Sequence, residues 1–293
     1  MLAQRDGDKA YRMRLRFRAI LTGDGCVHPG SVHDAISARI AERLGFEAAM
    51  FAGSVASLAV LGAPDVVVLT LTEFAEQARR ICRAAELPLL VDADHGYGNA
   101  LNVMRTVEEL ENAGVAALTI EDTALPAPFG ATATSLLSID EGKGKIAAAL
   151  EARDDPSLAV IARTGAMSIG GVNEAVARAR AYAALGPDAL FFTGVAERAH
   201  LDALAQATSL PIVLGSAPAK LGDRSALAAS RVRLSLQGHK PFMASVQAMY
   251  DTLKALRDGT APGDIGGAAS EELLRETTRA DDYEEWARRF LGA

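Results

Sequence analysis

The sequence is poor in cysteine and in aromatic residues. Cys26 and Cys82 are the two cysteines among 293 residues, and aromatic residues make up 5% of the chain. Two cysteines cannot form a disulfide framework, and their spacing is not that of a metal site, so we interpret both as buried, reduced thiols. Hydrophobic residues nevertheless make up 49% of the chain. A large aliphatic core of this kind is typical of helices packed around a parallel sheet.

The sequence also lacks an excess of positive charge. Its formal net charge is -7, which argues against nucleic acid as the main partner. An anionic small molecule is not excluded, because a local arginine or a bound cation can reverse the sign of the potential inside a pocket.

Long apolar runs are missing as well. None could span a bilayer, so we expect no membrane partner. Residues 1–21 contain several arginines but no apolar segment like that of a signal peptide, and Asp6 and Asp8 argue against a transit peptide. The turns at 53–54 and 96–98 are too short to indicate a phosphate-binding loop for a nucleotide. We therefore expect a cytoplasmic protein.

What the sequence does contain is a regular alternation of short apolar runs with longer amphipathic ones. We predict a first strand near Cys26 and further strands at 47–51, 88–92, 116–121, 158–163, 189–193, 211–214 and 232–237. Predicted helices lie between them, for example at 35–44, 100–112 and 173–185. Glycines that can adopt a left-handed conformation end three of the helices, at Gly45, Gly114 and Gly186. A capping box at 138–141 begins a helix that runs to Ala152.

Eight strand–helix units predict the fold class. Repeated βα order with continuous apolar strands indicates a parallel sheet. Eight units favour a (β/α)8 TIM-type barrel, although a flavodoxin-like open sheet would show the same alternation. We place the barrel at about 20–257 and a helical tail at 259–293, within a single catalytic domain, 1–293.

Polar residues follow the predicted strands, where TIM barrels carry their reactive groups. Asp92 and Asp94 are two positions apart, so on a strand they would point to the same side, and Glu121 ends the next strand. Three carboxylates at one place repel one another unless they share a cation, and oxygen ligands suit Mg2+ or Mn2+. The alternative is that these acids cap the helices that follow.

Three further side chains belong to the same predicted edge. Arg163 could bind a substrate carboxylate at two points, or it could be a salt bridge that holds the acids in place. His239 follows the last strand, and Ser54 follows the second. His95 stands beside the acid pair, where a loop or supporting role is the simpler interpretation.

At these positions the chain resembles the phosphoenolpyruvate mutase/isocitrate lyase superfamily. Residues 92–99, DADHGYGN, are similar to its D-x-D-x-G-[YF]-G signature, and 51–56, FAGSVA, resemble its second-strand loop. Glu121-Asp122 and residues 161–164 resemble the ends of its fourth and fifth strands. The similarity extends over roughly residues 14–257.

Within the superfamily the chain is most similar to the oxaloacetate decarboxylase family, on residues 92–111 and on the loop 121–130. This resemblance implies Mg2+-dependent decarboxylation of oxaloacetate, a small 2-keto dicarboxylic acid, to pyruvate and CO2 through a metal-stabilised enolate. It implies a metal bound at Asp92, with Asp94 and Glu121 holding its waters and Asp65 nearby. It also implies substrate contacts from Ser54, Arg163 and His239, of which we expect Arg163 and His239 to be catalytic.

One absence and two departures refine the expectation. The carbon–carbon lyases of the superfamily carry a Lys-Arg/Lys-Cys-Gly-His segment after the Glu-Asp pair, whereas residues 126–131 here are PAPFGA, so a retro-aldol lyase is disfavoured. Gly165 stands where the family usually has Asn or Asp, and Gly215-Ser216-Ala217 replaces a segment with larger side chains. Another 2-keto or substituted malic acid substrate therefore stays open, as does a catalytically weak carboxylate-binding homologue.

The resemblance also implies an assembly. Superfamily members exchange the last barrel helix between paired subunits, usually within a tetramer, so we expect a homodimer or homotetramer. In this chain the helix would be 242–257, with Met243, Val246, Met249, Leu253 and Leu256 at helical spacing. The same apolar stripe could also pack on its own barrel.

Overall fold

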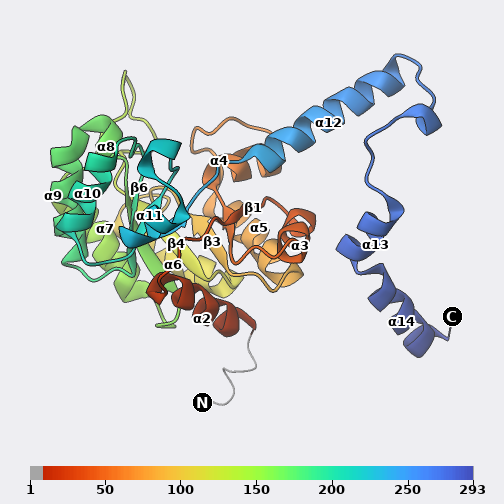
Figure 1. The fold of residues 1–293 in the computed structure, drawn as a ribbon, viewed down its shortest axis with the longest axis horizontal. Coiled ribbons are helices and arrows are strands. Elements are labelled where there is room, and N and C mark those ends of the chain that lie inside the picture. Colours follow the sequence, from red (N-terminus) through yellow and green to blue (C-terminus); the bar gives the residue numbers. More distant parts are fainter. Residues whose placement is uncertain (1–8, 293) are drawn as a thin grey trace.

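The computed structural model describes residues 9–292 and shows an eight-stranded parallel sheet. Its strands, in chain order, are β1 (Gly30–Ser31), β2 (Ala49–Phe51), β3 (Leu89–Asp92), β4 (Ala117–Glu121), β5 (Ala159–Thr164), β6 (Ala189–Phe192), β7 (Ile212–Leu214) and β8 (Val232–Ser235). Each strand pairs with the next one along the chain. A flavodoxin-like sheet would instead place later strands on both sides of the first. The sheet curls into a TIM-like barrel (Figure 1).

The two ends of the sheet meet beside β8. A parallel bridge joins Val27 to Leu234, with hydrogen bonds from the Val27 N–H to the Arg233 carbonyl (2.8 Å) and from the Ser235 N–H to the Val27 carbonyl (3.0 Å). The predicted first strand near Cys26 is confirmed by the pairing of Val27 with β8, and the strand assigned as β1 follows at Gly30–Ser31. Pro29 lies between them and has no N–H to donate to a ladder.

Helices surround the barrel in the expected order. They are α2 (Lys9–Thr22), α3 (Ala35–Arg43), α4 (Gly53–Ala56), η1 (Ser57–Leu61), α5 (Leu71–Ala84), α6 (Ala100–Ala113), α7 (Ile139–Ala152), α8 (Ala166–Ile169), α9 (Gly171–Ala183), α10 (Arg198–Ala207), η2 (Ala219–Leu221), α11 (Arg224–Ala229), α12 (Lys240–Arg257), η3 (Pro262–Asp264), α13 (Glu271–Thr278) and α14 (Ala280–Leu291). No helix among the described residues is both long and apolar enough to cross a membrane.

The predicted helix boundaries are confirmed where the sequence carries a stop or start signal. Gly45, Gly114 and Gly186 have φ angles of 78°, 91° and 78°, the left-handed conformation that ends a helix at low cost for glycine. At the start of α7, the Ser138 hydroxyl accepts the Glu141 N–H at 3.1 Å.

The core has two layers separated by the strands. Aliphatic side chains such as Val91 and Leu118 pack between the strands and the outer helices. A second cluster fills the barrel interior and includes Met13 and Phe17 from α2. Helix α2 therefore closes the end of the barrel at which the strands begin, and the other end is left for the site.

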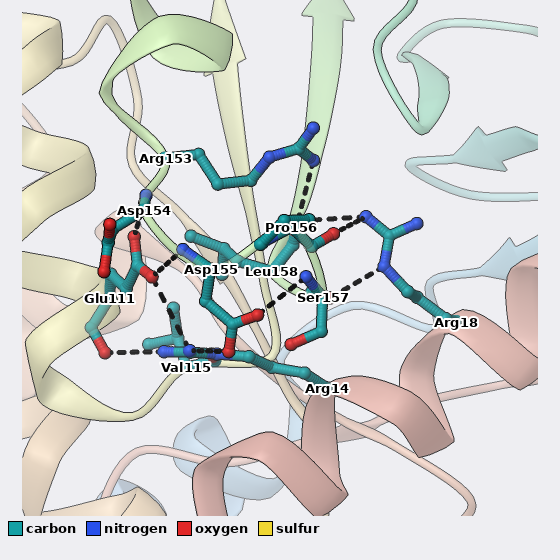
Figure 2. Close-up of polar contacts among 10 residues, drawn as sticks. All are labelled: Arg14, Arg18, Glu111, Val115, Arg153, Asp154, Asp155, Pro156, Ser157 and Leu158. Atoms are coloured by element: carbon teal, nitrogen blue, oxygen red, sulfur yellow. Dashed lines mark hydrogen bonds and ion pairs between the residues drawn. The ribbon is translucent and has the colours of Figure 1, made fainter. Parts of the chain in front are cut away.

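Polar contacts hold α2 against that closed end (Figure 2). The Arg14 guanidinium donates to the carbonyls of Val115 (3.1 Å) and Glu111 (2.7 Å) and to the Asp155 carboxylate (2.8 Å). Arg18 donates to the Ser157 carbonyl at 2.8 Å. Because these acceptors lie just before β4 and β5, the two arginines anchor α2 to the strand starts.

The C-terminal elements are arranged differently from the barrel helices. Helix α12 extends away from the barrel (Figure 1) and has no buried residue. After it, α13 packs beside α3, where an Arg39 N–H donates to the Thr277 carbonyl at 3.1 Å and Thr277 is buried. Helix α14 follows with no buried residue of its own.

Candidate active site

A cavity of about 250 Å³ lies at the carboxyl ends of the strands. It is lined by the polar residues named from the sequence, Ser54, Asp65, Asp92, Asp94, Glu121, Arg163 and His239, and by Met50, Ala52, Val67, Leu125, Phe191, Thr193, Gly215 and Leu236. The fold thus brings side chains from six strand ends into one small space. Larger cavities occur elsewhere on the molecule, but this is the one in which the acids converge.

Asp92 is held by two neighbouring strands at the end of β3. The Thr119 hydroxyl donates to Asp92 Oδ1 at 2.8 Å, and Arg163 Nη1 pairs with Asp92 Oδ2. The residue is 8% exposed. Asp92 caps no helix, because the helix that follows, α6, is capped by Asn99. The helix-capping alternative therefore does not describe this side chain.

Asp94 reaches the cavity by a route that the sequence argument did not foresee. Strand β3 ends at Asp92, and Asp94 has a φ angle of 47°, so strand alternation does not direct its side chain. A Cβ at Gly53 would stand 2.3 Å from Asp94 Oδ2, so glycine at 53 makes room for this carboxylate. Burial, together with the charges of Asp92 and Glu121, raises the pKa of Asp94 well above its ordinary value.

Glu121 and Arg163 lie opposite one another at the ends of β4 and β5. Arg163 Nε is 3.3 Å from Glu121 Oε2, yet Nε has no partner in hydrogen-bonding geometry, so the contact is electrostatic. Burial raises the pKa of Glu121 to about 7, although Arg163 opposes the shift. The Arg163 guanidinium also lies 5.4 Å from the centre of the Phe191 ring.

The cavity holds more negative than positive charge. Asp92, Asp94 and Glu121 face one guanidinium, and burial and then the charge of Asp92 raise the pKa of Asp65 as well. Between residues 9 and 292 no three His, Cys, Asp or Glu side chains form a ready ligand set for a metal. The surplus of carboxylate oxygens in the cavity suits a hard divalent cation that keeps part of its water shell.

His239 and Ser54 lie on the flanks of the cavity. The His239 ring Nδ1 is 2.9 Å from the Ser31 hydroxyl, which orients the imidazole from β1. Burial lowers the pKa of His239, while the charge of Asp92 acts in the opposite direction, so burial favours the neutral form of the ring. Ser54 is in the first turn of α4, directly after β2.

Two residues beside the site face away from the cavity. Asp122 accepts hydrogen bonds from Arg178 (2.7 Å) and from the Tyr182 hydroxyl (2.6 Å), so it fixes the end of β4 to α9. His95 is 3% exposed and is not among the cavity-lining residues. Burial, and then the charge of Lys145, lower the pKa of His95 to about 4. Its position fits the supporting role expected from the sequence.

The two segments that differ from the family pattern, Gly165 and residues 215–217, lie at different places relative to the cavity. Gly215 lines the active-site cavity, whereas Ser216 lines a separate cavity of about 850 Å³ beside β8. Gly165 follows β5 directly, and a Cβ there would stand 3.7 Å from the Thr193 hydroxyl. Of the segment 215–217, Gly215 is therefore the residue that borders the active site.

Sequence reasoning missed the uncharged half of the cavity. This half is lined by Phe191, Thr193 and Leu236. Each is an apolar or weakly polar residue, so the sequence alone assigns it to the hydrophobic core. Their signal was the alternation along β6 and β8, which places every second residue inside the barrel. Val67 was missed for another reason. It lies in a loop with a φ angle of 60°, a conformation that no sequence pattern predicts for valine.

Fold and sequence together define the class. The chain belongs to the phosphoenolpyruvate phosphomutase family, whose model matches residues 17–257. The crystal structure of phosphoenolpyruvate phosphomutase from Streptomyces platensis subsp. rosaceus is similar with a TM-score of 0.84 and 32% identity, covering 95% of this chain and 99% of that one. A phosphonopyruvate hydrolase in complex with oxalate and Mg2+ is similar with a TM-score of 0.82 and 29% identity, with the same coverage of 95% and 99%. The superfamily resemblance of the motifs is thereby confirmed.

More similar relatives narrow the assignment within that class. A protein of Bradyrhizobium sp. (strain ORS 278) named oxaloacetate decarboxylase is 58% identical over 96% of this chain and 98% of its own length. Another protein with this name, from Bradyrhizobium sp. (strain BTAi1 / ATCC BAA-1182), is 60% identical over 94% of this chain and 95% of its own length. The resemblance to the oxaloacetate decarboxylase family is confirmed by these matches.

Proposed function

We propose that this protein catalyses the metal-dependent decarboxylation of oxaloacetate to pyruvate and CO2. The observation that carries the proposal is the identity of 58% and 60% to proteins named oxaloacetate decarboxylase over nearly the whole chain. The site supports it, because a small cavity with clustered acids and one arginine suits a dicarboxylate that is bound together with a cation.

Mg2+, with Mn2+ as the alternative, fits the acidic side of the cavity. We assign Asp92 as the direct ligand and Asp94 and Glu121 as the acceptors that hold the waters of the ion. The raised pKa values of Asp94 and Glu121 support this, since buried carboxylates that repel one another are stabilised as anions by a nearby cation. When bound, the ion stabilises the negative charge that develops on the 2-keto oxygen.

Arg163 and Ser54 would fix the carboxylate next to the keto group. Arg163 is the one arginine or lysine that lines the cavity in the described part of the chain. Its guanidinium is already oriented by Asp92 and Glu121, so little side-chain entropy remains to be lost when the substrate binds. Ser54 adds a hydroxyl from α4 on the side of β2.

His239 would contact the substrate near the departing carboxylate or the enolate carbon. A neutral ring at this position does not hold the departing carboxylate as an ion pair would. The hydrogen bond to the Ser31 hydroxyl keeps the ring in place while the carbon–carbon bond breaks.

The loop after β4 supports decarboxylation over carbon–carbon lysis. Leu125 lines the cavity, but the segment 126–131 offers no Cys, Lys or His for proton transfer. Loss of CO2 from a β-keto acid needs no such base, because the electrons of the breaking bond flow into the keto group. A different 2-keto acid remains the second candidate, since Gly165 leaves space that a larger side chain would fill.

Coupled measurement of pyruvate release tests the proposal. Oxaloacetate should be turned over with Mg2+ and not with EDTA, and a panel of other 2-keto and substituted malic acids should be poorer substrates. A rate equal to the spontaneous one would contradict the proposal. Binding of oxalate, which resembles the pyruvate enolate, without turnover would instead favour the carboxylate-binding alternative.

We also propose that α12 is exchanged between subunits of a homodimer or homotetramer. Its apolar stripe is exposed, with Met249 at 57% and Leu253 at 64%. Residues of α11 and β8 line two cavities of about 850 Å³ and 590 Å³, at the place where a barrel normally packs its last helix. Because α12 does not fill this position in its own barrel, we propose that α12 of a second copy of the chain occupies it. We also propose that the tail 259–293 belongs to the same single domain as the barrel.

The exchange predicts that a charge on the stripe breaks the assembly. Leu253→Glu should shift the protein to monomers in sedimentation, because it places a carboxylate on the apolar face. Gln247→Glu adds a carboxylate to the polar face of α12 and should leave the assembly intact. A wild-type protein that is monomeric at micromolar concentration would contradict the exchange.

We propose a cytoplasmic location on chemical grounds. Cys26 and Cys82 are both free, as is usual for cysteines in a reducing compartment. Fractionation of the native cells, followed by detection of the protein, tests this location.

A further inference from the structure

Three uncharged residues lie next to one another at one side of the active-site cavity, and Gly165 adjoins it through Thr193. Gly165, Thr193 and Gly215 each come two residues after an inward-facing position of β5, β6 and β7, namely Arg163, Phe191 and Val213, and those three are paired in register. We call Gly165, Thr193 and Gly215 the glycine recess. Thr193 and Gly215 line the cavity directly. In an eight-stranded barrel, β6 lies opposite β2, so the recess faces the Ser54 side of the cavity.

The geometry shows how the recess is shaped. A Cβ at Gly165 would stand 3.7 Å from Thr193 Oγ1, 3.6 Å from Ile169 Cδ1 and 3.9 Å from Thr123 Oγ1, all ordinary contact distances. The space beside Gly165 could therefore hold a methyl group without displacing any atom. A Cβ at Gly215 would stand 3.0 Å from Thr193 Cγ2. The Thr193 hydroxyl thus faces the space beside Gly165, and its methyl group faces Gly215.

The charge of this wall is as informative as its shape. None of the three recess residues is charged, and the nearby cation, Arg163, is engaged with Asp92 and Glu121. In decarboxylation of oxaloacetate the C3–C4 bond breaks, its electron pair moves to C2–C3, and the keto oxygen takes the negative charge. C4 leaves as neutral CO2, and C3 later takes up a proton.

A cation at the departing carboxylate would oppose that reaction. It would stabilise the carboxylate in the bound substrate and lose that interaction as the charge leaves, which raises the barrier. A single neutral hydroxyl can orient the group with a smaller penalty, because its hydrogen bond is weaker than an ion pair with a buried cation. The arrangement of a charged wall at β3–β5 and an uncharged wall at β5–β7 therefore suits a substrate that must keep its charge at one end and lose it at the other.

We propose that the glycine recess binds the departing carboxylate and that the Thr193 hydroxyl donates the hydrogen bond that orients it. The inference rests on the proposed oxaloacetate decarboxylation and adds the subsite for the leaving group. In this proposal Thr193 contacts the substrate directly. A substrate as long as oxaloacetate then fits only if residue 165 is small.

Three variants test the recess without touching the metal side. Thr193→Val keeps the shape and removes the hydroxyl, and Thr193→Ser is the matched control that keeps it. Gly165→Ala fills the space with one methyl group, and the φ angle of -89° at Gly165 is open to alanine. For each protein, kcat and KM for oxaloacetate and the inhibition constant of oxalate are measured at saturating Mg2+.

Thr193→Val should raise KM by roughly 10-fold, as loss of a hydrogen bond to a charged group does, while Thr193→Ser stays close to wild type. Gly165→Ala should also raise KM. Oxalate lacks the departing carboxylate, so its inhibition constant should stay unchanged in all three variants. Wild-type KM in Thr193→Val and Gly165→Ala, or oxalate inhibition that weakens in step with KM, would overturn the recess assignment. Failure of the wild type itself to release pyruvate would overturn the proposed function instead.

Discussion

Each end of the barrel buries an arginine among carboxylates, but only at the closed end do the carboxylates receive enough hydrogen bonds and positive charge. At the closed end, Arg14 contacts the carboxylate of Asp155 and the carbonyls of Val115 and Glu111 (Figure 2). At the open end, Arg163 pairs with Asp92 and lies beside Glu121, with Asp94 close by.

The difference lies in the hydrogen-bond donors around the acids. At the closed end, the Glu111 carboxylate accepts the N–H groups of Asp154 (3.0 Å) and Asp155 (2.7 Å), and Asp155 accepts the Ser157 N–H at 2.9 Å. Burial opposes ionisation of Asp155, but the hydrogen bonds from Ser157 and Arg14 outweigh it and lower its pKa. At the open end the pKa values of Asp94 and Glu121 are raised instead. The chain therefore completes its closed end with its own backbone and leaves its open end short of positive charge.

The largest expected effect comes from removing one charge at the open end. Asp92→Asn keeps the shape and the acceptor for Thr119 but loses the anion that we assign as the metal ligand. Activity should fall by roughly 10²-fold or more, as loss of a strong electrostatic stabiliser does, and Mg2+ affinity should fall with it. Titration of Mg2+ against pyruvate release measures both. Equal metal dependence in wild type and variant would show that the active site is misplaced.

Removal of the arginine at the closed end should affect folding and not chemistry. Arg14→Met removes the guanidinium that pairs with Asp155, and breaking a buried ion pair costs about 3 kcal/mol or more of the free energy of unfolding. Urea denaturation measures the loss, and kcat of the folded protein should be unchanged. Arg16→Met is the matched control on α2, because Arg16 donates to an exposed carbonyl, that of Glu86. A similar loss in both variants would remove the distinction between the two positions.

Arg163→Lys should have a smaller and more selective effect at the open end. Lysine keeps the charge but loses the planar fork that binds a carboxylate at two points. KM for oxaloacetate should rise roughly 10-fold, while Mg2+ affinity stays close to that of the wild type. A loss of Mg2+ affinity as large as the change in KM would instead identify Arg163 as a structural support for the acids.

The smallest expected effect is that the acids at the two ends contribute to the free energy of unfolding with opposite pH dependence. The pKa of Asp155 is lowered in the folded protein, so the stability it contributes is present above its unfolded pKa and is lost as the pH falls through the folded value. The pKa of Glu121 is raised to about 7, so the folded state holds more protons and stability falls as the pH rises from its unfolded value towards 7.

Denaturation at pH 5 and pH 8 without metal isolates the contribution of Glu121, because Asp155, with its lowered pKa, is ionised at both pH values. The metal-free protein should lose stability on going to pH 8, and Glu121→Gln should reduce that loss because glutamine does not titrate. Mg2+ should restore stability at pH 8 in the wild type. A metal-free protein that is more stable at pH 8 than at pH 5 would contradict the charge shortage at the open end.

Much of the fold could be predicted from local patterns. Helix ends at Gly45 and Gly114 and the start of α7 after Ser138 depend on residues that signal their own conformation. The seven strands after the first were predicted because the strands of a parallel barrel are apolar on both faces. The first strand was predicted near Cys26, and only the pairing with β8 and β2 shows that it consists of Val27 and then Gly30–Ser31.

The candidate site was predictable on its charged side only. Asp92, Glu121 and Arg163 stand out because several acids and an arginine at adjacent strand ends are more than helix capping requires. Asp94 reaches the same cavity through a left-handed backbone and a glycine at 53, neither of which follows from strand alternation. Thr193 and Phe191 could not be distinguished from core, because their role depends on which neighbours are glycine.

Proton release on Mg2+ binding tests most directly whether the open end is short of positive charge. Calorimetric titration of Mg2+ at pH 6.5, in two buffers with different ionisation enthalpies, gives the number of protons exchanged. A bound cation should lower the pKa of Glu121 from about 7, so the wild type should release protons and Glu121→Gln should release fewer. Tight Mg2+ binding with no proton release in either protein would contradict the account, because it would mean that the acids were already ionised and satisfied without the metal.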